Sequence, residues 1–565
     1  MAARNVDDQS ADGAGMAGAY GVILAALIGP LCTKLKANLL ALQKTGKAVP
    51  PERVDLAKEF GFDPTEVEGL GVQTYDMGTD PLMKIRSIVI NEEEEEGLSQ
   101  ARFYQTMLKN VSTTSSGDQK PPLGTVCVIL GAGNQSFLSI SDVLYHMFVR
   151  GSVALLKHHP VLIRCKPIID YVMAPLIDAG YLVSLDADIP LTQALVYSEL
   201  TDAVHLTGGI NTHDAIVWGT EEPETRRAKN EPVLKAQMFA ELGAVTPYIV
   251  VPSETPTTEW TTDMIDMYAG MCAFAVADNC SCNCLACKVL ILPGDAKFDS
   301  FSTQFISKFK EKLEHTKLEP AYYPGIKDRY NLWMDNVDSL GDNVCKTVCT
   351  ENRKDVGSLP GSEFVLPFAI AEVKDVSAIK DESLFRTEPF APVVTIVRLP
   401  GATATEYTDI AFSFAQNRLW GNLSTSLIMP PSMYSKVIPK VIRGELLYGA
   451  VCINAPTFMG YQVSGYWGAP RGTSTLQDAQ SGHGEVCNAG GLFDTPRNSI
   501  AWVPWGQLRP PGPIPPLVSK CLARILALGW KALLPRRVRR MLAMQSSSLK
   551  HLSPLLSETQ LEFSC

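Results

Sequence analysis

Four cysteines stand between Asn279 and Lys288, and this segment is the part of the chain best suited to covalent chemistry. They are Cys280, Cys282, Cys284 and Cys287. A thiolate is an intrinsically strong nucleophile, so one of these side chains could attack an electrophilic carbon. Thiolates also bind zinc and iron–sulfur clusters, but structural sites usually collect their ligands in two separated pairs, and no second Cys and His cluster supports this one. We expect one functional thiol among buried cysteines and no metal, with a thiolate metal protein as the alternative.

A second candidate site lies where an apolar run meets a glycine-containing turn. The run Thr125 to Leu130 ends at Gly131-Ala132-Gly133. The two glycines suggest a dinucleotide-binding fingerprint, but Ser136 stands in place of its third glycine, so we interpret the segment as an ordinary strand-to-helix turn. Asn134 follows the turn, and a side-chain amide just beyond the carboxyl end of a strand lies where ligands bind in open α/β sheets.

Short apolar segments that alternate with stretches of helical length must position these groups. The first are Thr125–Leu130, Ser152–Lys157, Ala203–Leu206 and Tyr248–Val251, and the later ones are Val289–Leu292, Pro392–Val397 and Ala450–Asn454. Continuous apolar runs are typical of parallel strands that are buried on both faces, and their alternation with helices predicts an α/β fold. The two sets predict two α/β domains.

We predict four parts along the chain. They are N-terminal helices with the first parallel sheet (1–240), a second α/β domain that carries the nucleophile (241–455), a segment that returns towards the first domain (456–500), and a proline-rich linker with a basic tail (501–565).

The bulk composition is that of an ordinary globular protein, with 46% hydrophobic and 19% charged residues. A formal net charge of −10 argues against nucleic acid as the main partner. The first residues carry acids where a secretion signal needs bases, and the apolar run Gly18 to Leu31 meets Pro30 before it could span a bilayer. We interpret the run as a buried or docking helix, with a membrane anchor as the alternative. Fourteen cysteines without a secretion signal predict free thiols and a cytoplasmic location.

The C-terminal tail differs in charge from the rest of the chain. From Thr495 onwards there are ten Lys or Arg residues but only two acids. Between Leu517 and Leu534 the apolar and the basic residues fall on opposite helical faces, and Arg536 to Arg540 follows directly. This pattern predicts either peripheral contact with an anionic membrane or docking on the acidic body of the protein itself.

Six segments resemble, in the same order, motifs of the aldehyde dehydrogenase superfamily. Asn279 to Lys288 is similar to the nucleophile segment N-x-G-Q-x-C-x-A-x-[KR], with Cys284 at the position of the nucleophile. Glu241 to Pro247 (ELGAVTP) resembles E-L-G-G-K-S-P. The other four are Asn134 at the P-W-N segment, Val153–Lys157 at the cofactor strand, Leu206–Gly209 (LTGG) at F-T-G-S, and Glu388–Val393 (EPFAPV) at E-x-F-G-P-V.

The resemblance implies an aldehyde dehydrogenase-like fold, with a Rossmann-like cofactor domain and a second α/β catalytic domain. It implies that Cys284 is the nucleophile, Glu241 the general base and Asn134 a donor in the oxyanion hole. The residues that it places at the cofactor are Lys157, Thr207, Gly208, Gly209, Glu388 and Phe390. It further implies a homo-oligomer.

The implied activity is oxidation of a small-molecule aldehyde to a carboxylic acid with NAD or NADP, through a cysteine thiohemiacetal and a thioester. These residue types suit that chemistry, because an aldehyde releases hydride only after a nucleophile has made its carbon tetrahedral. The developing oxyanion then needs hydrogen-bond donors that are already in place, and a carboxylate can activate the water that hydrolyses the thioester.

The chain departs from the family pattern at several positions. Ser281 and Cys282 replace the Gly-Gln that precedes the nucleophile, and Gly209 replaces a serine. A reversible disulfide between Cys282 and Cys284 is conceivable, but burial of Cys282 without a redox role is the preferred interpretation. Pro160 stands where many NAD-using members carry a glutamate for the adenine ribose, so the choice between NAD and NADP is open.

Two histidines precede that proline, and we interpret His158 and His159 as a partly exposed strand end. Two further functions stay open on the same fold. One is an acyl-transferring dehydrogenase or acyl reductase, against which Glu241 argues because such relatives lack that base. The other is a catalytically impaired binding protein.

Overall fold

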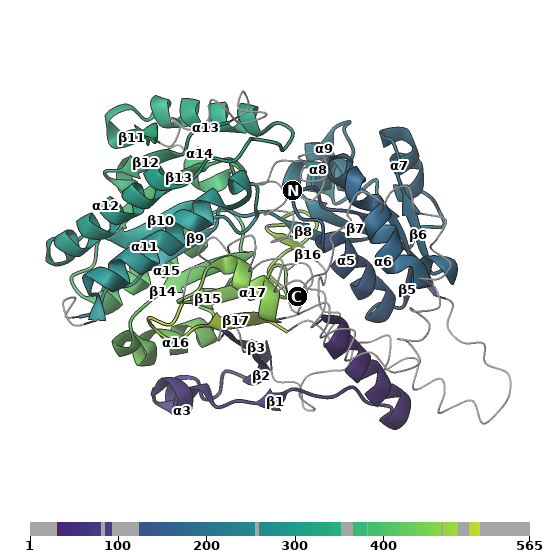
Figure 1. Ribbon diagram of the computed structural model, residues 1–565, viewed down its shortest axis with the longest axis horizontal. Coiled ribbons are helices and arrows are strands. Elements are labelled where there is room, and N and C mark those ends of the chain that lie inside the picture. Colours follow the sequence, from purple (N-terminus) through teal and green to yellow (C-terminus); the bar gives the residue numbers. More distant parts are fainter. Residues whose placement is uncertain are drawn as a thin grey trace, which may run out of the picture. The chain divides into compact units, whose positions relative to one another are not determined.

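The computed structural model describes residues 31–80, 85–92, 124–254, 259–351, 365–380, 382–464, 467–483 and 496–508 (Figure 1). All of them belong to one compact unit, Leu27–Pro510. The basic tail, and all of the N-terminal apolar run except Leu31, lie outside the described residues, so the predictions made for them stay predictions. Among the helices of the described part, none is long and apolar enough to cross a membrane.

A six-stranded sheet holds the Asn134 turn. Its strands are β4 (Thr125–Leu130), β5 (Ser152–Lys157), β6 (Leu182–Leu185), β7 (Ala203–Gly208), β8 (Gln237–Leu242) and β16 (Gly482–His483). The first five are parallel and lie in the order β6-β5-β4-β7-β8, and β16 pairs antiparallel with β8. This is the strand order 3-2-1-4-5 of dinucleotide-binding folds, in which the direction of winding reverses between β4 and β7.

Five helices accompany this sheet. They are α5 (Leu138–Phe148), α6 (Lys166–Asp178), α7 (Ile189–Val196), α8 (Ile210–Trp218) and α9 (Pro223–Lys229). Helix α5 packs on β4 and β5, and α8 packs on β7 and β8. The crossovers from β4 to β5, β5 to β6 and β7 to β8 each lead to a parallel neighbour, whereas the one from β6 to β7 passes to the other side of β4.

The nucleophile segment belongs to a second, eleven-stranded sheet. Its strands are β1 (Glu52–Arg53), β2 (Val72–Asp80), β3 (Ile85–Glu92), β9 (Pro247–Val250), β10 (Val289–Pro293), β11 (Val344–Val348), β12 (Ala369–Val373), β13 (Val393–Leu399), β14 (Ser424–Ile428), β15 (Ala450–Ile453) and β17 (Asn498–Trp502). Seven parallel strands, in the order β17-β15-β14-β9-β10-β13-β12, form its centre. Antiparallel strands complete both edges, with β3, β2 and β1 beyond β17 and β11 beyond β12.

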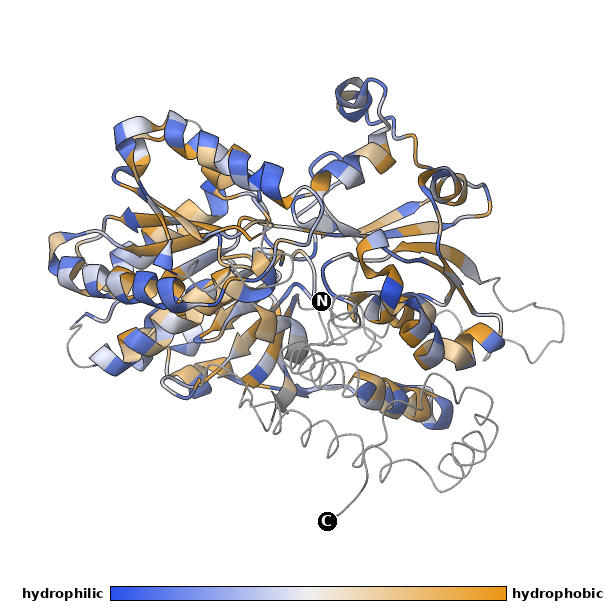
Figure 2. Cartoon of the chain, turned by 45° about the horizontal axis from the view of Figure 1, so that its top comes forward, coloured by the Kyte–Doolittle hydropathy of each residue, from blue (hydrophilic) through white to orange (hydrophobic). Residues whose placement is uncertain are grey.

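Helices cover the eleven-stranded sheet. They are α3 (Leu56–Phe60), α11 (Thr262–Ala277), α12 (Asp299–His315), α13 (Ile326–Ser339), α14 (Ser383–Arg386), α15 (Ala404–Arg418), α16 (Tyr434–Arg443) and α17 (Thr457–Ser464). A further helix spans residues 31–45. The core lies on both faces of the sheet, because Val289 and Ile291 of β10 join one buried cluster while Leu290 and Leu292 join another. In Figure 2 the strands are accordingly largely hydrophobic.

The predicted α/β fold, with a Rossmann-like parallel sheet and a second α/β sheet, is confirmed. The sheets divide the chain differently from our expectation for 1–240, however. Strands β1 to β3 pair beyond β17 in the eleven-stranded sheet, and the six-stranded sheet begins at Thr125. A periodicity shows that a segment is a strand but not which sheet edge it joins, because that depends on long-range pairing.

Candidate active site

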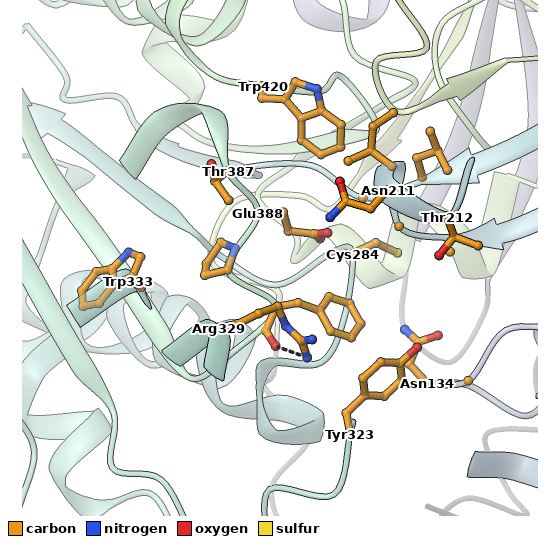
Figure 3. Close-up of a pocket in the computed structure, with 18 of the residues that line it drawn as sticks. Asn134, Asn211, Thr212, Cys284, Tyr323, Arg329, Trp333, Thr387, Glu388 and Trp420 are labelled. Carbon is orange, nitrogen blue, oxygen red and sulfur yellow. Dashed lines mark hydrogen bonds between the residues drawn. The ribbon is translucent and has the colours of Figure 1, made fainter. Parts of the chain in front are cut away.

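A cavity of about 630 Å³ lies where the sequence predicted the site. Gly133 and Asn134, which follow β4, line it together with Thr207 and Gly208 at the end of β7. The carboxyl ends of β4 and β7 flank the reversal of strand order, the usual place for a ligand in an open α/β sheet. The remaining predicted residues that line it are Gly209, Glu241, Cys284, Glu388 and Phe390. The cavity therefore joins side chains from both sheets (Figure 3).

Cys284 follows a strained turn. The three consecutive residues Asn279, Cys280 and Ser281 all have positive φ angles, 56°, 53° and 58°. Non-glycine residues in this conformation cost of order 1–3 kcal/mol each and persist only where their surroundings hold them. The chain therefore needs a dense set of contacts around this turn.

Side-chain amides supply part of those contacts. The Asn279 Nδ2 donates to the carbonyl oxygens of Cys282 and Asn134, at 3.1 and 3.3 Å. The Asn134 Nδ2 donates to the carbonyl oxygen of Cys282 at 3.1 Å, and the Gln135 Nε2 donates to the Asn283 Oδ1 at 2.8 Å. The two residues after the β4 turn thus fasten the nucleophile turn directly to the six-stranded sheet.

Lys288 supplies the other part. Its buried Nζ donates to the Ser281 carbonyl and hydroxyl oxygens, at 3.1 and 2.7 Å, and to the carbonyl oxygen of Ala391 at 3.1 Å. Burial lowers the pKa of Lys288, while the nearby Glu388 carboxylate opposes that shift. The motif lysine therefore holds the turn in place, and the hydroxyl of Ser281 explains how a serine occupies the position of the family glycine.

Cys284 faces a buried carboxyl group. Its Sγ lies 3.9 Å from the Glu241 Oε1 and can donate a weak hydrogen bond to it. Burial, followed by the carboxylates of Glu241 and Glu388, raises the pKa of the Cys284 thiol well above its usual range. The resting thiol is therefore protonated, and its ionisation requires a base or a nearby positive charge.

Glu241 is held at the carboxyl end of β8 with 2% of its surface exposed. The Trp467 Nε1 donates to its Oε1 at 2.7 Å, while its buried Oε2 has no hydrogen-bond partner among the described residues. Burial, together with the charge of Asp142, raises the pKa of Glu241 to about 8. A carboxyl group with such a pKa exchanges a proton readily near neutral pH, as a general base must.

Glu388 lies across the cavity, and its position depends on the absence of a side chain at Gly243. Its Oε1 accepts a hydrogen bond from the backbone nitrogen of Ala244 at 3.4 Å. A Cβ atom at Gly243 would lie 1.9 Å from its Oε2, inside the carboxylate. Burial raises the pKa of Glu388, and Lys288 opposes the shift. The glycine of the ELGA motif is thus required so that this carboxylate can approach the chain.

We expect Gly243→Ala to displace Glu388 and to weaken the site. Overpacking of this kind typically costs about 1–3 kcal/mol of stability, and movement of a cofactor carboxylate should lower cofactor affinity by about tenfold or more. Thermal unfolding and a cofactor-binding titration measure both effects. Gly270→Ala in α11 is the matched control, because its Cβ would meet nothing closer than 3.9 Å. Equal behaviour of the two variants would contradict the proposed dependence on Gly243.

The outer wall of the cavity is aromatic and cationic. The Arg329 guanidinium lies 5.8 Å from the ring centroid of Tyr323 and 5.7 Å from that of Phe390. The Arg329 Nη2 also donates to the carbonyl oxygen of Phe390 at 3.5 Å, and φ of Phe390 is +40°. A strained backbone that presents a ring beside a cation is typical of a ligand site.

His158 is not the partly exposed strand end that we expected, whereas His159, just after the end of β5, is partly exposed. His158 is only 2% exposed, and its Nε2 lies 2.8 Å from the Ser184 Oγ. His159 lines the cavity, stacks on Tyr323 and fills the space that a Cβ at Gly133 would need. Burial, and then Lys157, lowers the pKa of His159 to about 4, so its ring is neutral at neutral pH.

The cavity can receive a dinucleotide. The first turn of α8 lines it with Ile210, Asn211 and Thr212, and the residue that caps this helix, Gly209, supplies no side-chain hydrogen bond. Free backbone N–H groups at a helix N-terminus suit a phosphate group. The backbone at Gly209 leaves open space where a side chain would stand, which allows a close approach. These features, at the reversal of strand order, fit a nicotinamide dinucleotide.

One predicted cofactor residue lies apart from the others. Lys157 ends β5 but does not line this cavity, although burial lowers its pKa. The thiols of the cysteines near Cys284 point to different partners. The thiol of Cys282 points to the carbonyl oxygen of Phe390 and that of Cys280 to the carbonyl oxygen of Glu319. Within the described ranges every cysteine is free, and no cluster of three or more His, Cys, Asp or Glu side chains could hold a metal ion.

Sequence reasoning missed several residues of the site. Trp467, Tyr323 and Arg329 come from loops and helices far along the chain, and no motif marked them. The sequence did contain a signal for Asp142. Asp142 and His146 stand four residues apart on α5, which follows the Asn134 turn, and this spacing puts both side chains on one face of the helix.

No protein-family model and no curated protein sequence matches the chain. Among solved structures, it is similar to a salicylaldehyde dehydrogenase from Pseudomonas putida G7 in complex with salicylaldehyde, at 15% identity over 88% of this chain and 87% of that chain, with a TM-score of 0.46. It is also similar to an NAD-dependent aldehyde dehydrogenase from Sinorhizobium meliloti, at 16% identity over 88% and 84%, with a TM-score of 0.47. A third is succinic semialdehyde dehydrogenase from Streptococcus pyogenes in complex with NADP+, at 14% identity over 80% of each chain, with a TM-score of 0.46. All three of these solved structures are aldehyde dehydrogenases.

Proposed function

We propose that the protein oxidises an aldehyde to a carboxylic acid with NAD or NADP. The observation that carries this proposal is a cysteine thiol 3.9 Å from a buried carboxyl group, in a cavity at the reversal of strand order. A thiol beside a base is the arrangement of an activated nucleophile, and the cavity provides room for both substrate and dinucleotide.

The first step that this geometry supports is thiol addition. The Cys284 Sγ attacks the aldehyde carbon while ionised Glu241 takes the thiol proton, which forms a thiohemiacetal. The alkoxide oxygen is stabilised by the backbone N–H of Cys284 and by an N–H of the Asn134 amide, one of whose two amide hydrogens already donates to the carbonyl of Cys282. Each such donor is worth about 3–4 kcal/mol of barrier.

The bound dinucleotide would supply the hydride acceptor. The residues that would hold it are Thr207, Gly208 and Gly209 at the end of β7, with Glu388 and Phe390 opposite. Loss of hydride from the alkoxide leaves a thioester on Cys284. After Glu241 has released the thiol proton to solvent, it removes a proton from the water that attacks the thioester, and this proton then passes to the Cys284 thiolate that leaves. The products are the carboxylic acid and the free thiol.

Glu241 distinguishes between two acceptors of the acyl group on Cys284, water and a second thiol. A buried base beside the nucleophile favours water as the acyl acceptor, whereas an acyl-transferring enzyme needs room for a large thiol and no such base. We therefore place acyl transfer second. Assembly into a homo-oligomer and membrane contact through the tail stay predictions from the sequence.

A panel of aliphatic, aromatic and acidic aldehydes, assayed separately with NAD and NADP, tests the proposal. We expect reduction of at least one cofactor that depends on the aldehyde, with release of one equivalent of acid per turnover. Oxidation that appears only when coenzyme A or another thiol is added would instead support the acyl-transferring alternative. A chain that binds the dinucleotide but oxidises no member of the panel would be a binding protein.

A further inference from the structure

A second polar cluster lies beneath the cavity, buried against α5. Asp142 and His146 project from this helix, and His205 and Thr207 project from β7. The Asp142 Oδ1 lies 3.4 Å from the His205 Nε2, and its Oδ2 accepts from the Thr207 hydroxyl at 3.3 Å. The His205 Nδ1 lies 2.9 Å from the His146 Nε2. Asp142, His146 and His205 are all fully buried, so this cluster is sealed from bulk water.

This cluster shares one face of the sheet with Glu241. Strands β7 and β8 are parallel neighbours in which Thr207 pairs with Glu241 and His205 pairs with Phe239. Paired residues of adjacent strands point to the same face, and so do residues two apart on one strand. Glu241 therefore stands on the face that carries the cluster, and the His146 ring also contacts the ring of Phe239, 5.0 Å between centroids.

The electrostatic consequence follows from burial. Two carboxylates in one buried region repel each other, so a charge on either one raises the free energy needed to ionise the other. Asp142 has two hydrogen-bonding neighbours, His205 and Thr207. Glu241 has the Trp467 indole and, more weakly, the Cys284 thiol on one oxygen, and no partner on the other oxygen among the described residues.

We propose that Asp142 is a positioning residue that acts through Glu241: its carboxylate, held by His205 and Thr207, keeps a proton on Glu241 in the resting protein. The inference rests on the proposed function in that Glu241 is the general base. The proposal explains why Glu241, which must ionise during turnover, is protonated in the resting protein. An ionised Glu241 would place a permanent negative charge beside the Cys284 thiol.

Other titratable groups lie on the elements around Glu241 and must be considered with Asp142. They are His146 on α5, His205 on β7, Cys284 in the nucleophile loop, Glu388 before β13 and His483 on β16. Burial, and then the charges of His205 and Arg150, lowers the pKa of His146 well below its usual range, so this ring is neutral. Burial and His213 likewise lower the pKa of His483 to about 4. Neither ring supplies a positive charge to Glu241 at neutral pH.

Infrared difference spectroscopy of the full chain without substrate tests the proposal independently of aldehyde oxidation. The C=O stretch of a protonated carboxylic acid, assigned to Glu241 by its absence in Glu241→Gln, should persist at pH 7 and disappear with a midpoint near pH 8. A midpoint near the ordinary value of a glutamate would overturn the proposal. A protein that oxidises no aldehyde can still give this result, so failure of the proposed function is distinguishable.

Substitution of Asp142 separates charge from structure. Asp142→Asn and Asp142→Ser both remove the charge and should move the midpoint down by about one pH unit or more, which raises the ionised fraction of Glu241 at pH 6 about tenfold. Asp142→Glu retains the charge and should leave the midpoint near that of the wild type. In an active enzyme the acid limb of the kcat profile should shift with the midpoint.

Asp170→Asn on α6 is the matched control. Asp170 pairs with Lys166 and Ser184 and does not line the cavity, so its removal should leave the Glu241 midpoint unchanged. The proposal fails if the neutral and the charged Asp142 variants give the same midpoint, or if Asp170→Asn shifts it as far. Melting temperatures show which variants are folded, and either neutral variant suffices for the comparison.

Discussion

Replacement of Cys284 by alanine is expected to abolish aldehyde-dependent reduction of the cofactor, with a loss on the order of 10⁴-fold or more. No covalent adduct can form without the thiol, because the thiol sulfur is the nucleophile. The Glu241 carboxyl beside it is positioned to accept the proton that the thiol loses. Cofactor affinity should change little, since the dinucleotide would contact the end of β7 and Glu388, on other parts of the cavity wall. Steady-state oxidation and a cofactor fluorescence titration measure the two quantities.

Cys282→Ala is the matched control for this experiment. Cys282 is fully buried, and its thiol points to the carbonyl oxygen of Phe390. Burial raises the pKa of Cys282 to about 12, so it carries no thiolate at neutral pH. This variant should retain measurable oxidation and at most a reduced melting temperature. If Cys282→Ala were inactive and Cys284→Ala active, the nucleophile would be Cys282 and not Cys284.

Glu241→Gln should stall the enzyme at the thioester. Hydride transfer precedes hydrolysis, so we expect about one equivalent of reduced cofactor per active site, formed more slowly than in the wild type because Glu241 also takes the thiol proton. Steady turnover should then fall by about 10²- to 10⁴-fold, the usual contribution of a general base. The Gln side chain can still accept the hydrogen bond from the Trp467 indole, which keeps the site folded. Rapid-mixing absorbance at the wavelength of the reduced cofactor measures burst and steady rate together.

The pH dependence supplies an internal check on the same residue. The pKa of Glu241 in the folded protein, about 8, lies above the ordinary value of 4.5, so the folded state holds a proton that the unfolded state releases between these values. Wild-type stability should therefore decline as pH rises through this window, while turnover rises because the base becomes ionised. Glu241→Gln should lose both dependences. A burst-free and fully active variant would place the base elsewhere.

Local sequence determined the strands and the order of the motifs. The runs Thr125 to Leu130 and Ser152 to Lys157 are strands over their predicted lengths, and apolar side chains occupy most of their buried positions. The residues next to strand ends, Asn134 and Glu241 among them, could be placed at a cavity because parallel strands end at one edge of their sheet.

Tertiary structure alone decided the surroundings of those residues. The indole of Trp467 reaches Glu241 across 226 positions of sequence, and Glu388 fills the space above Gly243. The resemblance placed Lys157 at the cofactor, yet this residue does not line the cavity. No local pattern records these distances.

The sequence by itself thus predicted the candidate reacting groups: a thiol, a carboxyl group and an amide next to strand ends and turns. Only the tertiary structure decided their protonation. A pKa depends on burial and on charges brought near by folding, so Glu241 beside Asp142, and Cys284 beside two carboxyl groups, take values that neither residue would have in its own segment. The edge strands β1 to β3 were not predicted from the sequence, and the pairing of β3 with β17 placed them in the eleven-stranded sheet.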